Sequence, residues 1–251
     1  MIKLFVLIYL LVFSCCATAQ QLTIITENAP PNSFIENNRL TGKSVEIVQA
    51  VLKEIGMAGH DIVIYPWARG YRMLERQKNI VLFPTSRTAY REDLFKWAGP
   101  ISDNPVNLYK LKTRKDIKPL RLDDLKKYRV GSTRNDQKSQ YLSSRGFDVQ
   151  LVNEDRQNIG KLFLGRIDIL PYAAARLRYD IRLSGYDPGQ IEKIWHLEEI
   201  STHNYAAFSR STDDRIVERF QRGFDAVKKK GIQDRILKKW EKRLQEKEEG
   251  P

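Results

Sequence analysis

Cysteine is nearly absent from this 251-residue chain, whose two cysteines, Cys15 and Cys16, stand together near the N-terminus. Both lie in a segment with the pattern of a cleavable secretory signal, so we expect the mature chain to contain none. This excludes disulfides as a source of stability, although an exported protein would meet an oxidising environment. About 230 residues would remain, enough for one large hydrophobic core or two smaller ones.

The signal-like segment has three parts. Lys3 supplies an early positive charge, the apolar run 4–13 follows, and small residues lead to an Ala-Thr-Ala sequence that ends at Ala19. The pattern predicts a signal peptide over residues 1–19, cleaved after Ala19, and a periplasmic location. The apolar run is short for a transmembrane helix. Lipid attachment at Cys15 is an alternative anchor, disfavoured by the bulky Phe13 just before it.

Histidine is scarce too, and His60, His196 and His203 lie far apart without the spacing of a metal-binding motif. We therefore expect no metal and no cofactor. Recognised nucleic-acid-binding signatures are also absent. The net charge of +12 favours anionic partners. However, bases and acids alternate along expected helices such as residues 215–249, a pattern typical of solvated helix faces, so we expect no nucleic-acid partner.

Short apolar runs alternate with amphipathic stretches in two successive series. The first series predicts strands at residues 21–27, 61–67 and 79–86 and helices at 42–56, capped by Ser44, and 68–78. The second predicts strands at 129–133, 148–153, 167–172, 191–200 and 203–210 and helices at 136–146, 155–166, 173–185, 213–230 and 232–245. This alternation predicts an α/β fold with largely parallel, helix-covered sheets in two lobes.

The segment PTSRTAYRED, residues 84–93, directly follows the third apolar run of the first series. Open α/β sheets bind ligands at the carboxyl ends of their strands, and a guanidinium can hold a carboxylate through two parallel hydrogen bonds. Ser86, Thr88 and Arg91 are therefore candidate anion ligands. The alternative is an ordinary strand-to-helix turn, in which Ser86 or Thr88 caps the helix and Arg91 is solvated.

Five segments, in order, resemble the periplasmic solute-binding proteins of the type II, polar amino-acid-binding class (bacterial extracellular solute-binding proteins, family 3). They are LTGKSVEIVQAVLKEIG (40–56), YPWARGYRMLERQK (65–78), SRTAYREDLFKWAGPI (86–101), LKKYRVGSTRNDQKSQYL (125–142) and LFLGRIDILPY (162–172). The resemblance covers nearly all of the mature chain. It implies the type II periplasmic-binding-protein fold, in which two lobes, each a mostly parallel sheet flanked by helices, close on a small solute.

The resemblance also implies the division of the chain. Lobe 1 would comprise residues 20–111 and 202–251, and lobe 2 residues 112–201. Two crossover strands, near Leu108 and near Tyr205, would join them.

In the family, an arginine that follows the third strand holds the ligand's α-carboxylate, and Arg91 matches it, with Ser86 and Thr88 beside it. Arg87 would be a second anion contact or a surface residue. Trp67 matches an aromatic residue that stacks on the ligand, although a core tryptophan would fit the same position.

Further ligand contacts follow from the same resemblance. Glu27 and Asn28 stand where the first strand leads into one wall of the cleft. Arg69 would face the cleft or solvent. In the second lobe, Asp136 and Gln137 stand at a helix start, together with Asn135, where an ordinary N-cap is the alternative.

One family feature is missing. Amino-acid-binding relatives carry an acidic residue, which holds the ligand's ammonium, a few positions after Gly-Arg-x-Asp, whereas residues 171–174 here read Pro-Tyr-Ala-Ala. Asp168 belongs to that turn and is expected to be structural, and Tyr172 would supply an aromatic wall or a phenol donor. The solute is therefore expected to bear a carboxylate and either to lack the usual α-ammonium or to have it read by Asp136 or Glu27.

We thus expect a monomeric periplasmic protein that binds a small anionic or zwitterionic solute, without covalent chemistry, for an ABC importer with a permease in the inner membrane. One alternative is a dehydratase-like enzyme on the same scaffold, with Glu27 or Asp136 as general base and Arg91 holding the substrate. Another is a soluble sensor that presents the solute to a membrane receptor.

Overall fold

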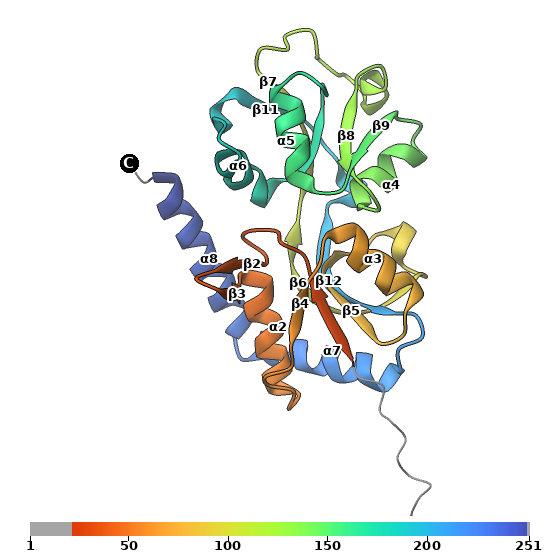
Figure 1. Ribbon diagram of the computed structural model, residues 1–251, viewed down its shortest axis with the longest axis vertical. Coiled ribbons are helices and arrows are strands. Elements are labelled where there is room, and N and C mark those ends of the chain that lie inside the picture. Colours follow the sequence, from red (N-terminus) through yellow and green to blue (C-terminus); the bar gives the residue numbers. More distant parts are fainter. Residues whose placement is uncertain (1–21, 250–251) are drawn as a thin grey trace, which may run out of the picture.

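The computed structural model describes residues 22–249, which form two lobes one above the other (Figure 1). The expected signal peptide and its cleavage site lie outside the described residues. Within the described part of the chain, no helix has both the length and the apolar character needed to cross a membrane.

The first lobe is built on a five-stranded sheet in the order β4-β1-β5-β12-β6. β1 runs parallel to β4 and β5, whereas β12 runs antiparallel to β5 and β6. Every residue of β5 is buried, as its uninterrupted apolar run predicted. The strands are β1 Thr23–Thr26, β4 Ile62–Ile64, β5 Ile80–Ser86, β6 Phe95–Asn104 and β12 Thr202–Ser209.

Helices cover this sheet: α2 Lys43–Glu54, α3 Trp67–Arg76, α7 Asp214–Lys229 and α8 Ile232–Glu249. The apolar positions spaced along α2 are buried, as their helical period predicted. The expected cap at Ser44 is wrong, because the N-cap is Gly42 and Ser44 lies inside the helix. The sequence analysis also missed the hairpin of β2, Phe34–Glu36, and β3, Arg39–Thr41.

The second lobe contains a three-stranded antiparallel sheet, β10-β7-β11, and a parallel pair, β8 and β9. A parallel bridge from Val130 to Ile169 connects the two sets of strands. The elements are β7 Val106–Leu111, β8 Val130–Thr133, α4 Gln137–Ser144, β9 Val149–Val152, α5 Asp155–Phe163, β10 Leu170–Ala173, α6 Ala174–Leu183 and β11 Ile191–His196. The parallel strands β8 and β9 each precede a helix, in agreement with the expected α/β class, whereas β10 precedes α6 but pairs antiparallel with β7.

The two chain crossings lie where β6 meets β7 and where β11 leads to β12. β7 pairs with β10 and β11 of the second lobe, although the sequence analysis assigned residues 106–111 to the first. Ile200 packs in the core of the second lobe, and β12 begins at Thr202 in the sheet of the first. We therefore propose crossings at Pro105 and Ser201, which moves the first boundary toward the N-terminus.

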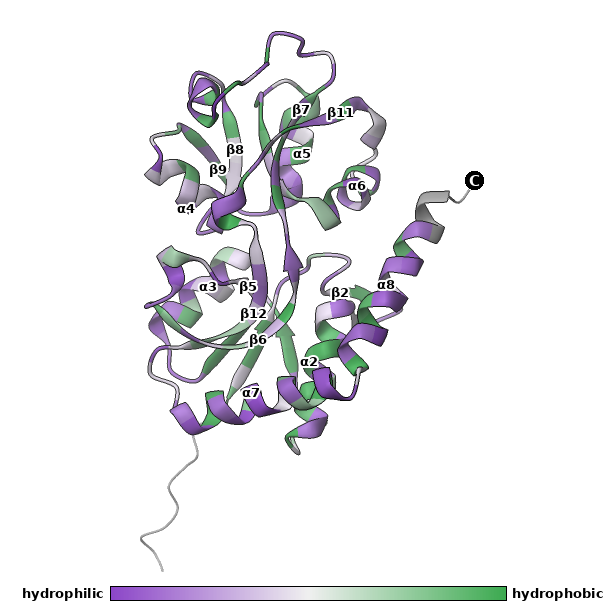
Figure 2. Ribbon diagram, turned by 180° about the vertical axis from the view of Figure 1, so that it is seen from behind, coloured by the Kyte–Doolittle hydropathy of each residue, from purple (hydrophilic) through white to green (hydrophobic). Residues whose placement is uncertain are grey.

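Each lobe has its own hydrophobic core. One core cluster packs α2 and α7 against the sheet of the first lobe, and another lies beneath β7 and β8 of the second. Figure 2 shows the hydrophobic residues along the strands and inner helix faces, with hydrophilic residues along the outside of α7 and α8. Separate cores allow the lobes to behave as two bodies linked by the crossing strands.

Candidate functional site

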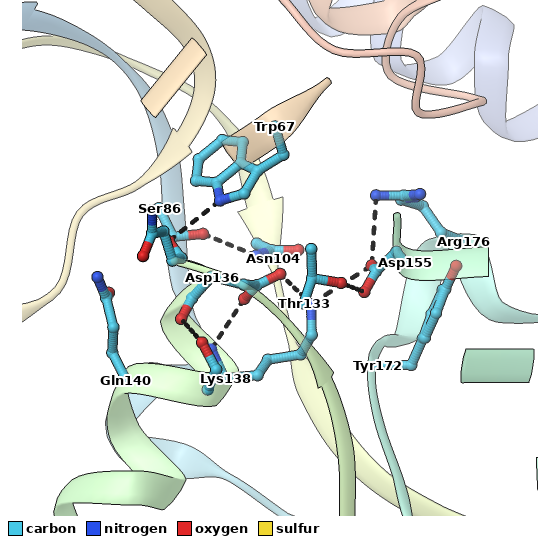
Figure 3. A network of polar contacts seen from close by, with 12 residues as sticks. Trp67, Ser86, Asn104, Thr133, Asp136, Lys138, Gln140, Asp155, Tyr172 and Arg176 are labelled. Atoms are coloured by element: carbon cyan, nitrogen blue, oxygen red, sulfur yellow. Dashed lines mark hydrogen bonds and ion pairs between the residues drawn. The ribbon is translucent and has the colours of Figure 1, made fainter. Parts of the chain in front are cut away.

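A cleft between the lobes gathers polar side chains from both of them, and Figure 3 shows its centre. Most of the residues lining it lie at or just after the carboxyl ends of β1, β4, β5, β8, β9 and β10, as expected for α/β sheets, whereas Asn104 belongs to β6 and Asn204 to β12. They are Glu27, Asn28, Asn32, Ile64, Tyr65, Pro66, Trp67, Pro84, Ser86, Arg91, Asn104, Asp136, Gln137, Lys138, Asn153, Glu154, Asp155, Arg156, Ala173, Arg176 and Asn204.

Arg91 lies in the cleft with only 1% of its surface exposed. Its Nε donates to Gln140 Oε1 (3.1 Å), its Nη2 to the Asn135 carbonyl (3.0 Å) and its Nη1 to the Ser86 carbonyl (3.3 Å). Burial lowers the pKa of the guanidinium, opposed by the neighbouring Tyr71. The alternative of a capped helix with a solvated Arg91 is wrong, since Arg91 is buried and the chain forms only a three-residue 3-10 turn, η2 Ala89–Arg91.

Trp67 is placed both as a core tryptophan and as an aromatic residue at the cleft, the two alternatives that the sequence left open. Its ring packs against Tyr71 at a centroid distance of 5.7 Å in the core of the first lobe, and its edge lines the cleft. The indole Nε1 donates to the Asn135 carbonyl at 3.1 Å. The ring also lies 5.4 Å from the Arg91 guanidinium carbon, a cation–π arrangement.

Charged side chains from α4 and α5 form the floor of the cleft in the second lobe. Lys138 contacts Asp136 at 2.5 Å and Asp155 at 3.4 Å, and Thr133 donates to Asp155 at 2.8 Å. Asp136 also accepts from the Lys138 backbone N–H, as the expected N-cap of α4. These contacts raise the pKa of Lys138 and lower that of Asp155, against the effect of burial.

Arg176, at the start of α6, is a cleft residue that the sequence analysis missed. Its Nη2 donates to Asp180 at 3.1 Å, while its Nη1 lies 3.8 Å from Asp155 and 4.0 Å from Glu27. Its Nε is buried and has no hydrogen-bond partner among the described residues. The expected role of Tyr172 is wrong in this arrangement, because its side chain is fully buried and donates to Asp180 at 2.8 Å.

Glu27 follows β1 and faces the charged residues of the second lobe across the cleft. Its side chain is 22% exposed, and Arg176 is the nearest cation, at 4.0 Å. Burial raises the pKa of this carboxyl to about 7, although the attraction of Arg176 opposes the rise.

The other expected site residues divide into two groups. Ser86, Asn28 and Gln137 line the cleft, and Gln137 Oε1 is buried without a hydrogen-bond partner in the described chain. Thr88 and Arg69 are not lining residues. Arg69 instead stacks on the exposed side of Tyr65, with its guanidinium carbon 3.9 Å from the ring centre.

Arg87 and Asp168 lie in ion pairs outside the cleft lining. Arg87 pairs with Glu92 at 2.5 Å. Asp168 accepts hydrogen bonds from Arg129 and Arg114, in keeping with its expected structural role. Across residues 22–249, no cluster of three or more His, Cys, Asp or Glu side chains is arranged to hold a metal ion.

Residues 22–243 match the model of the bacterial extracellular solute-binding proteins, family 3. No match was found among curated proteins.

Solved structures share the fold. A histidine kinase sensor domain with similarity to periplasmic binding proteins superposes with a TM-score of 0.75 at 22% identity, over 87% of this chain and 95% of that one. An ancestral arginine-binding protein bound to glutamine gives 0.72 at 21%, over 87% and 96%. The arginine-, lysine-, histidine-binding protein ArtJ from Geobacillus stearothermophilus gives 0.73 at 15%, over 88% and 95%. The chain therefore has the type II periplasmic-binding-protein fold.

Proposed function

Because the chain belongs to the bacterial extracellular solute-binding proteins, family 3, we propose that it binds a small zwitterionic or carboxylate-bearing solute, such as an amino acid, in the cleft between its lobes. The binding is non-covalent, and the protein acts outside the cytoplasm after export.

The observation that carries this proposal is the balance of charge in the cleft lining, to which both lobes contribute. A lining with both signs of charge can pair with both ends of a zwitterion, whereas one sign alone would repel one end. The bases are Arg91, Lys138, Arg156 and Arg176, and the acids are Glu27, Asp136, Glu154 and Asp155.

We place the carboxylate of the solute toward Arg91 and Ser86. A guanidinium carries five N–H donors, and Gln140 and two backbone carbonyls accept from three of those of Arg91. Tyr71 is a further hydrogen-bond partner, so at most two donors remain for a ligand. We place the cationic group toward Glu27 and Asp155, since these carboxylates approach Arg176 only to 4.0 and 3.8 Å and can accept further hydrogen bonds. Glu27 and Asp155 would then hold the ammonium of the ligand, the role of the acidic residue that amino-acid-binding relatives carry and this chain lacks.

Delivery to an ABC importer is the role we propose for the bound solute, because one solved structure with the same fold is the substrate-binding protein of an amino-acid ABC transporter. Sensing is the second candidate, favoured by the similarity to the histidine kinase sensor domain. A permease and an ATPase encoded beside this chain would support delivery, and a receptor kinase would support sensing.

The test is a thermal-shift screen of residues 20–251 with three sets of compounds: amino acids, carboxylic acids without an ammonium, and amines without a carboxylate. A ligand that binds only the folded protein raises the melting temperature more as its concentration exceeds its Kd, so at equal concentrations amino acids should give the largest shifts. Calorimetry on Arg91→Lys should then show weaker binding of carboxylates, because the ammonium of lysine cannot offer a planar fork.

Arg87→Lys is the matched control, since Arg87 pairs with Glu92 and is not a lining residue. It should leave the affinity unchanged. A screen in which amines alone raise the melting temperature would contradict the carboxylate assignment, and a screen in which no polar solute does so would contradict solute binding itself.

A further inference from the structure

A row of hydrogen bonds joins the two lobes beside the cleft, and the carbonyl of Asn135 is at its centre. This carbonyl accepts from Arg91 Nη2 at 3.0 Å and from Trp67 Nε1 at 3.1 Å, and both donors belong to the first lobe. Asn135 has a φ of +59°, in the left-handed region that asparagine tolerates better than most residues. The local backbone of the second lobe thus presents one carbonyl oxygen to two donors of the first.

Gln140 of α4 extends the row. Its Oε1 accepts from Arg91 Nε at 3.1 Å, and its Nε2 donates to the Tyr71 hydroxyl at 3.3 Å. The guanidinium also lies against the Tyr71 ring, at 5.0 Å from the ring centre. One amide side chain of the second lobe therefore contacts two residues of α3 and η2 in the first.

Gln140 and Asn135, the residues of the row that belong to the second lobe, are not lining residues of the cleft, whereas Arg91 and Trp67 are. The charged contact across the cleft between Arg176 and Glu27 is longer, at 4.0 Å. Gln140 and the Asn135 carbonyl are thus placed to hold the lobes together, through Arg91, Trp67 and Tyr71, without themselves touching a solute.

We propose that Gln140 and the Asn135 carbonyl form a latch for Arg91 and Trp67, which stabilises the closed arrangement of the lobes and so sets the affinity for every solute. Gln140 is then a positioning residue. The effect on affinity rests on the function proposed above, but the effect on the lobes does not.

The expected effect of losing the Gln140 hydrogen bond is large because its donor, the Arg91 guanidinium, is charged. A hydrogen bond to a charged group contributes about 1.5–3 kcal/mol, so loss of the Gln140 contact should lower the ratio of closed to open molecules about tenfold or more. If the solute binds only the closed arrangement, the apparent Kd rises as the closed fraction falls.

The experiment measures the distance between the lobes with spin labels, by double electron–electron resonance on ligand-free protein. Labels at Lys78→Cys and Ser143→Cys report on exposed positions of the first and second lobes, and the mature chain adds no other cysteine. Gln140→Leu should shift the distances toward longer values. Gln140→Glu should shift them toward shorter ones, since a carboxylate strengthens the bond to Arg91.

Gln157→Leu is the matched control, because Gln157 lies on α5 of the second lobe and its Oε1 accepts from the local Asn153 N–H. It should leave the distances as they are. Distances that do not change in Gln140→Leu and Gln140→Glu would overturn the latch. So would a Gln140→Leu variant that is more open but binds every solute found in the screen with unchanged Kd, whereas a screen without any ligand would count against the proposed function and leave the distance result intact.

Discussion

Replacing Glu27 by glutamine should stabilise the protein, and the gain should depend on pH. Burial raises the pKa of this carboxyl from the ordinary 4.5 to about 7, so folding disfavours its ionised form by about 3 kcal/mol. The charged groups that face it are Arg176 of α6, Asp155 of α5, and Asp136 and Lys138 at the start of α4. Two of these four are acids, so their field leaves the burial penalty largely uncompensated.

Proton linkage gives the direction in which this gain in stability changes with pH. Below pH 4.5 the Glu27 carboxyl is protonated in both the folded and the unfolded chain, so it adds no pH dependence to the stability. As the pH rises from 4.5 to 7, the carboxyl ionises in the unfolded chain before it does in the folded protein. The folded protein therefore loses stability over this range. Glutamine stays neutral throughout. The unfolding free energy of Glu27→Gln minus that of the unsubstituted protein should therefore be near zero at pH 4.5 and reach about 3 kcal/mol at pH 8.

Urea denaturation of both proteins at four pH values between 4.5 and 8 measures this difference, and other titrating groups cancel in it. Glu75→Gln, at an exposed position of α3, controls for the substitution itself. A variant that is less stable than the unsubstituted protein at pH 8 would refute the reasoning, because the attraction between Glu27 and Arg176 would then outweigh the cost of burial.

Three further predictions concern stability and binding. Asp168→Asn should lower the unfolding free energy at pH 7 by about 2 kcal/mol in urea denaturation, because Arg129 donates to both carboxylate oxygens and holds the pKa of Asp168 well below its usual range; this contribution should be lost as the pH falls through that lowered pKa. Gly42→Ala should lower the melting temperature, since φ is +124° and a methyl group would collide with the Asn32 carbonyl; an unchanged melting temperature would contradict this geometry. Binding of a cationic group beside Glu27 should release protons at pH 7, which calorimetry in buffers of different ionisation enthalpy would detect as a buffer-dependent heat, and a buffer-independent heat would place the cation elsewhere.

The fold was predicted from the sequence in most of its elements because periodicity reports burial directly. The helices expected at residues 213–230 and 232–245 correspond to α7 and α8, and the continuous apolar run at 79–86 is the buried strand β5. The hairpin of β2 and β3 was missed because its strands are three residues long and β3 buries none of its side chains. The first lobe boundary was misplaced since a strand carries no mark in its own sequence of the sheet that it will join.

The site was less predictable than the fold. Arg91, Trp67 and Glu27 follow strand ends and line the cleft, so position along the chain was enough to find them. Arg176 was missed because it is one of three arginines in the amphipathic segment 173–185, and nothing in the sequence distinguishes it from a solvated helix residue. Tyr172 was assigned to the cleft although its hydroxyl turns to the buried Asp180, a contact that depends on how α6 packs on β10.

Arg91 can serve both roles proposed for it, because its donors divide between them. Nε carries one hydrogen and each Nη carries two. Gln140 and the two backbone carbonyls accept one from each nitrogen, and Tyr71 is a further hydrogen-bond partner, so at most one N–H on each Nη is left for a carboxylate. A bound carboxylate need not displace Gln140 or Asn135. The two roles then differ in selectivity: Arg91→Lys should weaken binding of carboxylates more than that of other solutes, whereas Gln140→Leu should weaken all solutes by the same factor. If Arg91→Lys and Gln140→Leu each lowered the affinity for every solute by the same factor, Arg91 would act only in the latch and would not bind the carboxylate.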